Sequence, residues 1–181
     1  MEKINMSLFN VDSNNTFGGI FVEEAGHYNV KVLPSSKYAK TKTTGNEMLT
    51  LDYEVLDGKY TGGQIRFNNV VWTPDNVELS VKRFNTLLVA ADVADGTEIN
   101  SIEDILRGII GKTLNVNTEW QQSDYSGKWN LNVKGYDKVD HTGSKPNGET
   151  RPNDNSQPQN KQSQPFNSGN EIDINDDQLP F

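Results

Sequence analysis

The sequence predicts a mostly β domain with a small helical insert, followed by a disordered C-terminal tail. Apolar and polar side chains alternate in several short segments, which is the period of half-buried strands. One central segment instead repeats apolar residues at helical spacing. After Asp140 the chain becomes rich in Asn, Gln, Ser, Pro and Gly, a composition that buries too little apolar surface to offset the entropy of folding.

Five segments carry the strand pattern. They are defined by Tyr28, Val30 and Val32; by Leu49, Leu51, Tyr53 and Val55; by Ile65 to Trp72; by Leu114, Val116 and Thr118; and by Trp129, Leu131 and Val133. Residues 20–22 are a candidate edge strand. Residues 34–46 form the predicted loop between the first two strands, and residues 123–127 the turn between the last two.

The helical insert follows the third strand. Asp75 and Glu78 resemble a capping pair, and the helix is predicted to end at Asp95-Gly96. A second, short helix is predicted from Ser101 to Gly111. Three strands, a helical insert and two strands are the order of elements in an OB-fold, a small five-stranded Greek-key barrel. A β-sandwich or another small barrel is the alternative.

The chain divides into four parts by composition. These are an N-terminal arm (residues 1–19), the OB-fold-like domain (20–140), a disordered linker (141–170) and an acidic tip (171–181). The linker holds only one large apolar residue, Phe166, so we expect it to act as a flexible tether.

Composition also limits the classes of function. The 181-residue chain has a formal net charge of −8, which argues against a basic coat that wraps duplex DNA. It has no cysteine, which excludes thiol catalysis, thiolate metal sites and disulfides. No signal core or apolar run of membrane length occurs, so we expect a cytoplasmic protein with no membrane partner. A homo-oligomer is compatible with the sequence.

The predicted loop at residues 34–46 combines positive charge with an aromatic ring. It contains Lys37, Tyr38, Lys40 and Lys42 and no acidic residue. In OB-folds this loop flanks the nucleic-acid groove. Lysines there would follow phosphates, and the tyrosine could stack on a base. A solvated surface loop is the alternative interpretation.

Further aromatic residues are candidates for stacking on unpaired bases. The candidates with their basic neighbours are Arg66, Phe67, Trp72, Trp120, Tyr125 and Lys128. Stacking on a ring needs no particular base sequence. Trp129 shares the alternation of Leu131 and Val133, so we expect it in the core instead. Tyr125 lies in the predicted turn at residues 123–127 and is the ring most expected to be exposed.

The last residues combine acidic and apolar side chains. Glu171, Asp173, Asp176 and Asp177 precede Leu179, Pro180 and Phe181. A partner could bury the ring of Phe181 and pair its main-chain carboxylate with Arg or Lys. Pro180 would stiffen the approach, and the acids would steer the tip toward basic surfaces. A generic solubilising tail is the alternative interpretation.

The sequence Asp176-Asp177-Gln178-Leu179-Pro180-Phe181 resembles the C-terminal tip of bacterial single-stranded-DNA-binding (SSB) proteins. Residues 26–30 (GHYNV), the strand at residues 49–55 and residues 111–116 (GKTLNV) resemble phage-encoded single-stranded-DNA-binding proteins. The body does not resemble that of cellular SSB, so tetramer formation is not implied. The resemblance implies a protein of a bacterial host cell.

These features predict sequence-independent binding of single-stranded DNA in replication, recombination or repair. The tip would recruit replication or recombination proteins. The alternative is an adapter that does not bind DNA and uses the tip to bind such a protein. The sequence predicts no enzyme, cofactor or metal site. Asp52 and Glu54 share a strand face, which an exposed polar surface explains better than catalysis.

Overall fold

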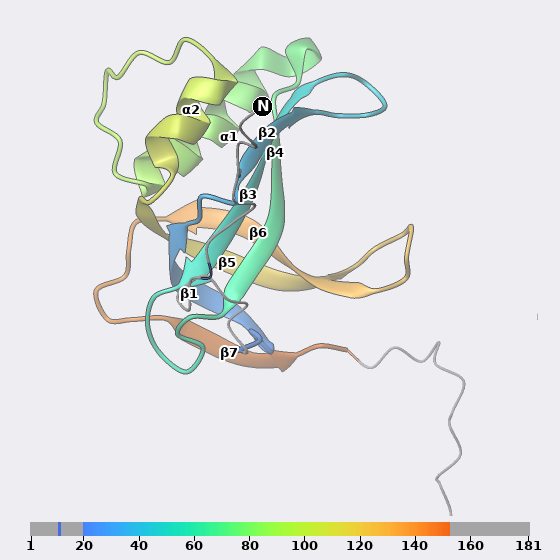
Figure 1. The fold of residues 1–181 in the computed structure, drawn as a ribbon, viewed down its shortest axis with the longest axis vertical. Coiled ribbons are helices and arrows are strands. Elements are labelled where there is room, and N and C mark those ends of the chain that lie inside the picture. The colour runs from blue at the N-terminus through green and yellow to red at the C-terminus, as the bar shows by residue number, and fades with distance from the viewer. Residues whose placement is uncertain (1–10, 12–19, 153–181) are drawn as a thin grey trace, which may run out of the picture.

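The structure is a computed structural model that describes residue 11 and residues 20–152 (Figure 1). Its strands form one seven-stranded antiparallel sheet in the order β2-β3-β1-β5-β6, with β4 on β3 and β7 on β1. The strands are β1 (Glu24–Val32), β2 (Lys37–Lys40), β3 (Glu47–Val55), β4 (Gln64–Val71), β5 (Thr113–Gln122), β6 (Trp129–Asp137) and β7 (Lys145–Thr150). The prediction of a mostly β fold with a helical insert is confirmed.

The helical insert packs at one end of the sheet, and β7 lies at the opposite end (Figure 1). It comprises the 3-10 turn η1 (Pro74–Asn76), α1 (Val77–Ala90) and α2 (Ile102–Ile109). Ser101 caps α2 as predicted, because its hydroxyl accepts a 3.1 Å hydrogen bond from the Asp104 N–H.

The boundaries of α1 differ from the prediction. Its cap is Asn76, whose side chain accepts from the Leu79 N–H at 3.1 Å, and not the Asp75–Glu78 pair. Pro74 starts the 3-10 turn, which moves the start of the α-helix beyond Asp75. The helix ends at Ala90, because Asp92 adopts a left-handed conformation with φ of 60°.

The core lies between the inner face of the sheet and the two helices. The alternating residues predicted to face inward are buried, including Tyr28, Val30, Leu49, Leu51, Tyr53, Leu114 and Val116. From the helices, Phe84, Leu87, Ile105 and Ile109 complete the cluster. Trp129 was predicted in the core but is only half-buried, because β5 and β6 extend beyond the region that the helices cover.

Two of the seven strands lie in segments predicted to be irregular. β2 falls within the predicted loop 34–46. β1 and β2 pair one after the other with the same edge of β3, with Val30 opposite Val55 and Lys37 opposite Thr50. β7 falls within the segment assigned to the linker, so the ordered part continues beyond residue 140. Residues 20–22, a candidate edge strand, form no strand.

A buried asparagine holds the chain leading into β7. Asn29 is 2% exposed, and its side chain donates to Asp57 Oδ2 at 2.9 Å and to the Asp140 carbonyl at 2.7 Å. Its Oδ1 accepts from the Asp140 N–H at 2.9 Å. Asp57 in turn accepts from the Ser144 N–H at 2.8 Å. A polar network of this kind has no hydrophobic periodicity, so strand patterns alone do not predict it.

Hydrogen bonds in this region also lower the pKa of two carboxyl groups. Burial alone would raise the pKa of Asp57, but hydrogen bonds from Ser144 and Asn29 outweigh it and lower that pKa. A hydrogen bond from Lys145, together with those from Thr142, lowers the pKa of Asp140. Both carboxylates are therefore stabilised in the charged form that accepts these bonds.

The sheet is not closed into a barrel. Among the described strands, β4 and β6 share no ladder of backbone hydrogen bonds. Asn68 of β4 bridges this opening, because its amide donates to the Tyr53 hydroxyl at 2.8 Å and to the Tyr136 hydroxyl of β6 at 2.6 Å. Burial raises the pKa of both tyrosines, which keeps these hydroxyls protonated.

Candidate nucleic-acid interface

The outer face of β2, β3 and β4 presents a row of polar side chains. Lys37 is paired with Thr50, and Thr50 with Asn69, so the three side chains project from the same face. The Thr50 hydroxyl donates to Asn69 Oδ1 at 2.8 Å. The loop at residues 41–46, which contains Lys42, and the β5–β6 tip both extend to the same side of the molecule (Figure 1).

A bulge interrupts β4 next to this row. Leu51 is opposite Asn68 and Tyr53 is opposite Ile65, which leaves Asp52 facing both Arg66 and Phe67. Phe67 has a φ of 62°, in the left-handed region, and its side chain is 65% exposed. For a residue with a Cβ this conformation costs about 1–2 kcal/mol. With Phe67 in this conformation, the bulge leaves a large ring exposed on the outside of the sheet.

The carboxylate of Asp52 stabilises this bulge through hydrogen bonds and an ion pair. Its Oδ1 accepts a 3.0 Å hydrogen bond from the Phe67 N–H. Its Oδ2 accepts from the Ser35 hydroxyl at 2.8 Å and pairs with Arg66 at 3.3 Å. Asp52 is 2% exposed, so the prediction that it belongs to an exposed polar strand face is wrong. The bulge and Ser35 cover it.

Arg66 and Phe67 form a stacked pair on the surface. The guanidinium carbon of Arg66 lies 5.0 Å from the centroid of the Phe67 ring. The ion pair with Asp52 fixes the guanidinium, so the ring and the positive charge are presented together. A flat exposed ring beside a cation suits a ligand that has both aromatic and anionic groups.

Three of the predicted contact residues lie on the other face of these strands. Tyr38 and Lys40 alternate with Lys37, and Tyr38 packs against the core with its hydroxyl 3.0 Å from Glu47 Oε1. That hydrogen bond raises the pKa of Tyr38. Trp72 likewise packs against Phe84 of α1, with ring centroids 5.9 Å apart. The structure therefore separates these three from the outer face.

The other candidates lie along the β5–β6 hairpin. Tyr125 is fully exposed at its tip, as expected, and Lys128 is exposed beside it. Trp120 is half-buried, and its indole N–H donates to the Glu149 carbonyl of β7 at 2.9 Å. Trp120 and Trp129 line a cavity of about 540 Å³ that β7 helps to enclose.

The predicted interaction tip lies outside the described residues. This applies to Asp173, Asp176, Asp177, Leu179, Pro180 and Phe181, as well as to the N-terminal arm except Val11. Of the residues described, no helix is long and apolar enough to cross a membrane. Within the same ranges, no group of three or more His, Cys, Asp or Glu side chains is placed to hold a metal ion.

Alternation did not predict the role of Asp52. It assigns a side chain to one face of a strand, but it does not show which other residues bury that side chain. The structural mark of the bulge is the spacing of two buried residues of β4. In the structure Ile65 and Val70 are both buried, yet they lie five positions apart with four residues between them, which a regular strand does not allow on one face. An extra residue between them is therefore required.

Residues 9–146 match a family described as a protein of unknown function, DUF669. The match covers the whole sheet up to the start of β7, together with both helices. No curated protein matches the chain. Since the match extends over most of the sequence, the chain belongs to the DUF669 family.

Proposed function

We propose that this protein binds single-stranded DNA, without sequence preference, on the outer face of β2, β3 and β4. The observation that carries the proposal is the exposed Phe67 ring, held at a φ of 62° by the buried Asp52 and stacked with Arg66. Backbone strain of this kind persists only where the surroundings enforce it, and it gathers at binding sites.

The chemistry of this pair matches an unpaired nucleotide. A base would stack on the face of the Phe67 ring opposite Arg66, which contributes roughly 1–3 kcal/mol and requires no particular base. Arg66 and Lys37 would contact the phosphates. The amide of Asn69 lies in the same row and could donate to a base edge or a phosphate.

We further interpret the sheet as an opened OB-fold. The strand β1 with its continuation β2, then β3 and β4, the helical insert, and β5 and β6 follow the order of the OB elements. In that fold the ligand lies across the second and third strands, between the two loops that border them. Those positions correspond here to β3 and β4, the loop at residues 41–46 and the hairpin tip with Tyr125 and Lys128.

The acidic segment at residues 171–181 would recruit proteins of DNA replication, recombination or repair. Its sequence resembles the SSB tip, and its negative charge keeps it apart from DNA. Phe181→Ala is expected to weaken partner binding and to leave DNA affinity nearly unchanged. Loss of DNA binding in that variant would contradict the proposal that the tip binds partner proteins and the sheet binds DNA.

The test is a titration of the full chain with oligo-dT and with duplex DNA of equal length, at several salt concentrations. We expect tight binding to oligo-dT that weakens as a power of the salt concentration, and weaker binding to the duplex. Equal affinity for the duplex contradicts single-strand binding. Absence of binding to oligo-dT at low salt overturns the proposal and favours the adapter.

A further inference from the structure

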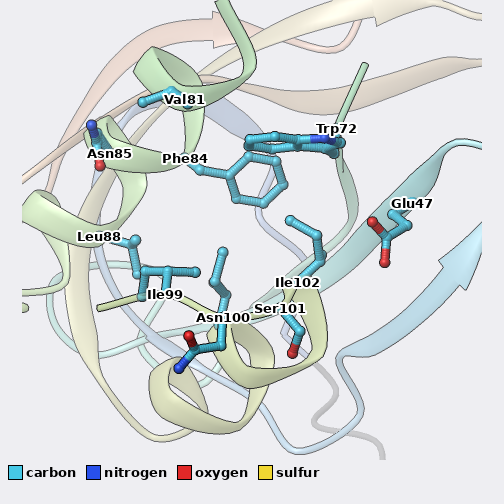
Figure 2. A pocket seen from close by; sticks show the side chains of 11 residues that line it. Glu47, Trp72, Val81, Phe84, Asn85, Leu88, Ile99, Asn100, Ser101 and Ile102 are labelled. Carbon is cyan, nitrogen blue, oxygen red and sulfur yellow. The ribbon is translucent and has the colours of Figure 1, made fainter. Parts of the chain in front are cut away.

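The helical insert forms an apolar groove that the proposed DNA interface does not use. The groove has a volume of about 360 Å³ and lies between α1, α2 and the ends of β3 and β4 (Figure 2). Its walls include Trp72, Phe84, Leu88 and Ile105. Figure 2 shows the Trp72 and Phe84 rings together on one side of it.

Part of this apolar surface faces solvent. Val81 and Ile99 line the groove and are 40% and 43% exposed. Large apolar side chains gathered around a concavity favour an occupant that removes them from water. The groove lies on the face opposite Lys37, because Glu47 and Trp72 alternate with Met48 and Val71 of the outer face. An occupant would therefore leave the outer face free.

The charged side chain that lines the groove indicates which kind of segment would bind there. Glu47 is the one charged residue among the groove's lining residues in the described part of the chain. The Tyr38 hydroxyl holds its carboxylate at 3.0 Å. Lys40 lies opposite Glu47 in the β2–β3 pair but does not line the groove. A segment with apolar side chains and a positive charge therefore complements the Glu47 carboxylate inside the groove, and an acidic segment does not.

Two segments of the chain outside the described residues are rich in apolar side chains. The acidic tip, residues 171–181, carries Glu171, Asp173, Asp176 and Asp177 and would be repelled by Glu47. Residues 3–9 read KINMSLF, with one lysine, no acid and four large apolar residues. Only the second segment has the charge that the groove requires.

The connection is long enough. Ile20 lies beside Gly63, which directly precedes β4, and Trp72 of the groove directly follows the far end of β4. Eight strand residues span about 26 Å. Residues 10–19 can extend over about 33 Å. The segment can therefore reach the groove of its own chain.

We propose that residues 3–9 of the same chain bind in the groove between α1 and α2, with apolar side chains against Trp72 and Phe84 and Lys3 near Glu47. The groove is then an intramolecular docking site for the N-terminal arm. This proposal does not depend on DNA binding by the outer face.

The absence of cysteine allows a direct test by disulfide formation in the full chain. Ser7→Cys combined with Asn85→Cys places one thiol in the segment and one on the groove wall. A disulfide requires Cα atoms about 4.4–6.8 Å apart. The controls are Ser7→Cys with Asn69→Cys on the outer face, and Asn175→Cys with Asn85→Cys for the acidic tip.

We expect the first pair to form an intramolecular disulfide at least about tenfold faster than either control, because docking raises the effective concentration of the two thiols. Phe9→Asp in the same background should remove that advantage. Equal rates in the three pairs, or no disulfide in the first, overturn the proposal. Faster reaction of the tip pair assigns the groove to the tip, and a disulfide-linked dimer assigns it to a second copy; both also overturn it.

Discussion

The Asp52 carboxylate accepts a 3.0 Å hydrogen bond from the backbone N–H of Phe67, across a bulge between β3 and β4. One partner is 2% exposed and the other 65% exposed, so a buried charge directly supports a surface ring. The bond satisfies an N–H that the bulge removes from the strand ladder. Stability and binding at this site are therefore linked through Asp52.

Phe67→Gly should separate binding from folding. Glycine adopts a positive φ without the steric cost that phenylalanine bears, so the free energy of unfolding should stay within about 1 kcal/mol of the wild-type value. Loss of the ring should weaken oligo-dT binding by about 1–3 kcal/mol, or roughly 5- to 150-fold. Urea unfolding and fluorescence titration measure the two quantities.

Tyr125→Gly provides the matched control at another exposed ring, because Tyr125 lies at the hairpin tip, away from the bulge. A smaller loss of affinity there than in Phe67→Gly is the expected order. Unchanged affinity in Phe67→Gly would show that this ring does not stack on bases.

Asp52→Ala should destabilise the protein as well as weaken DNA binding. The substitution leaves the Phe67 N–H and the Ser35 hydroxyl without their acceptor, which costs about 1–3 kcal/mol. The cost appears in urea unfolding at neutral pH. Asp75→Ala removes an exposed carboxylate of η1 and should change stability by less than about 0.5 kcal/mol. Equal stability of the two variants would contradict the role of Asp52.

Gly26→Ala should detach β7 from β1. Gly26 has a φ of 142°, and an added Cβ would overlap the Lys145 carbonyl oxygen and lie 2.8 Å from the Pro146 Cα. Since these are backbone atoms, the strand must move. Hydrogen exchange of the β7 amides should therefore become faster than in the wild type, whereas exchange in β3 and β4 changes less.

Gly108→Ala is the control for that substitution. It lies in α2, and a Cβ there meets no atom within 4 Å. Alanine also favours the helix by about 1 kcal/mol, so this variant should be as stable as the wild type or more stable. Protection of β7 that survives in Gly26→Ala would show that the strand tolerates the displacement.

Acid should weaken the attachment of β7. The folded-state pKa values of Asp57 and Asp140 are lowered, so the stability they contribute is complete above the unfolded value of about 3.9 and is lost as pH falls toward the folded values. The difference in unfolding free energy between wild type and Asp57→Asn should be constant from about pH 7 to pH 5 and shrink below about pH 4. A difference that does not shrink between about pH 4 and pH 2 would contradict this linkage.

Alternation was enough to predict five strands and the insert between them, because burial on one face imposes a period of two. It did not predict β7, whose residues 145–150 show no alternation of apolar and polar side chains and are half-buried or exposed. That strand is held by backbone pairing with β1 and by the Asn29 network. Nor did alternation place Tyr38 and Lys37 on opposite faces of the sheet, because residues 34–46 were predicted to form a loop and not a strand. The pairing of strands that are distant in the sequence determines on which face of the sheet such residues lie.

The pairing of β7 with β1 determines how a pulling force on the residues beyond 152 would act on the sheet. Thr150 lies opposite Glu24 and Lys145 opposite His27, so a pull applied beyond residue 152 and directed away from β1 reaches the Thr150 end first and opens the pairs one at a time. A partner that pulls on these residues in that direction would separate β7 from the sheet and leave β1 paired with β3 and β5.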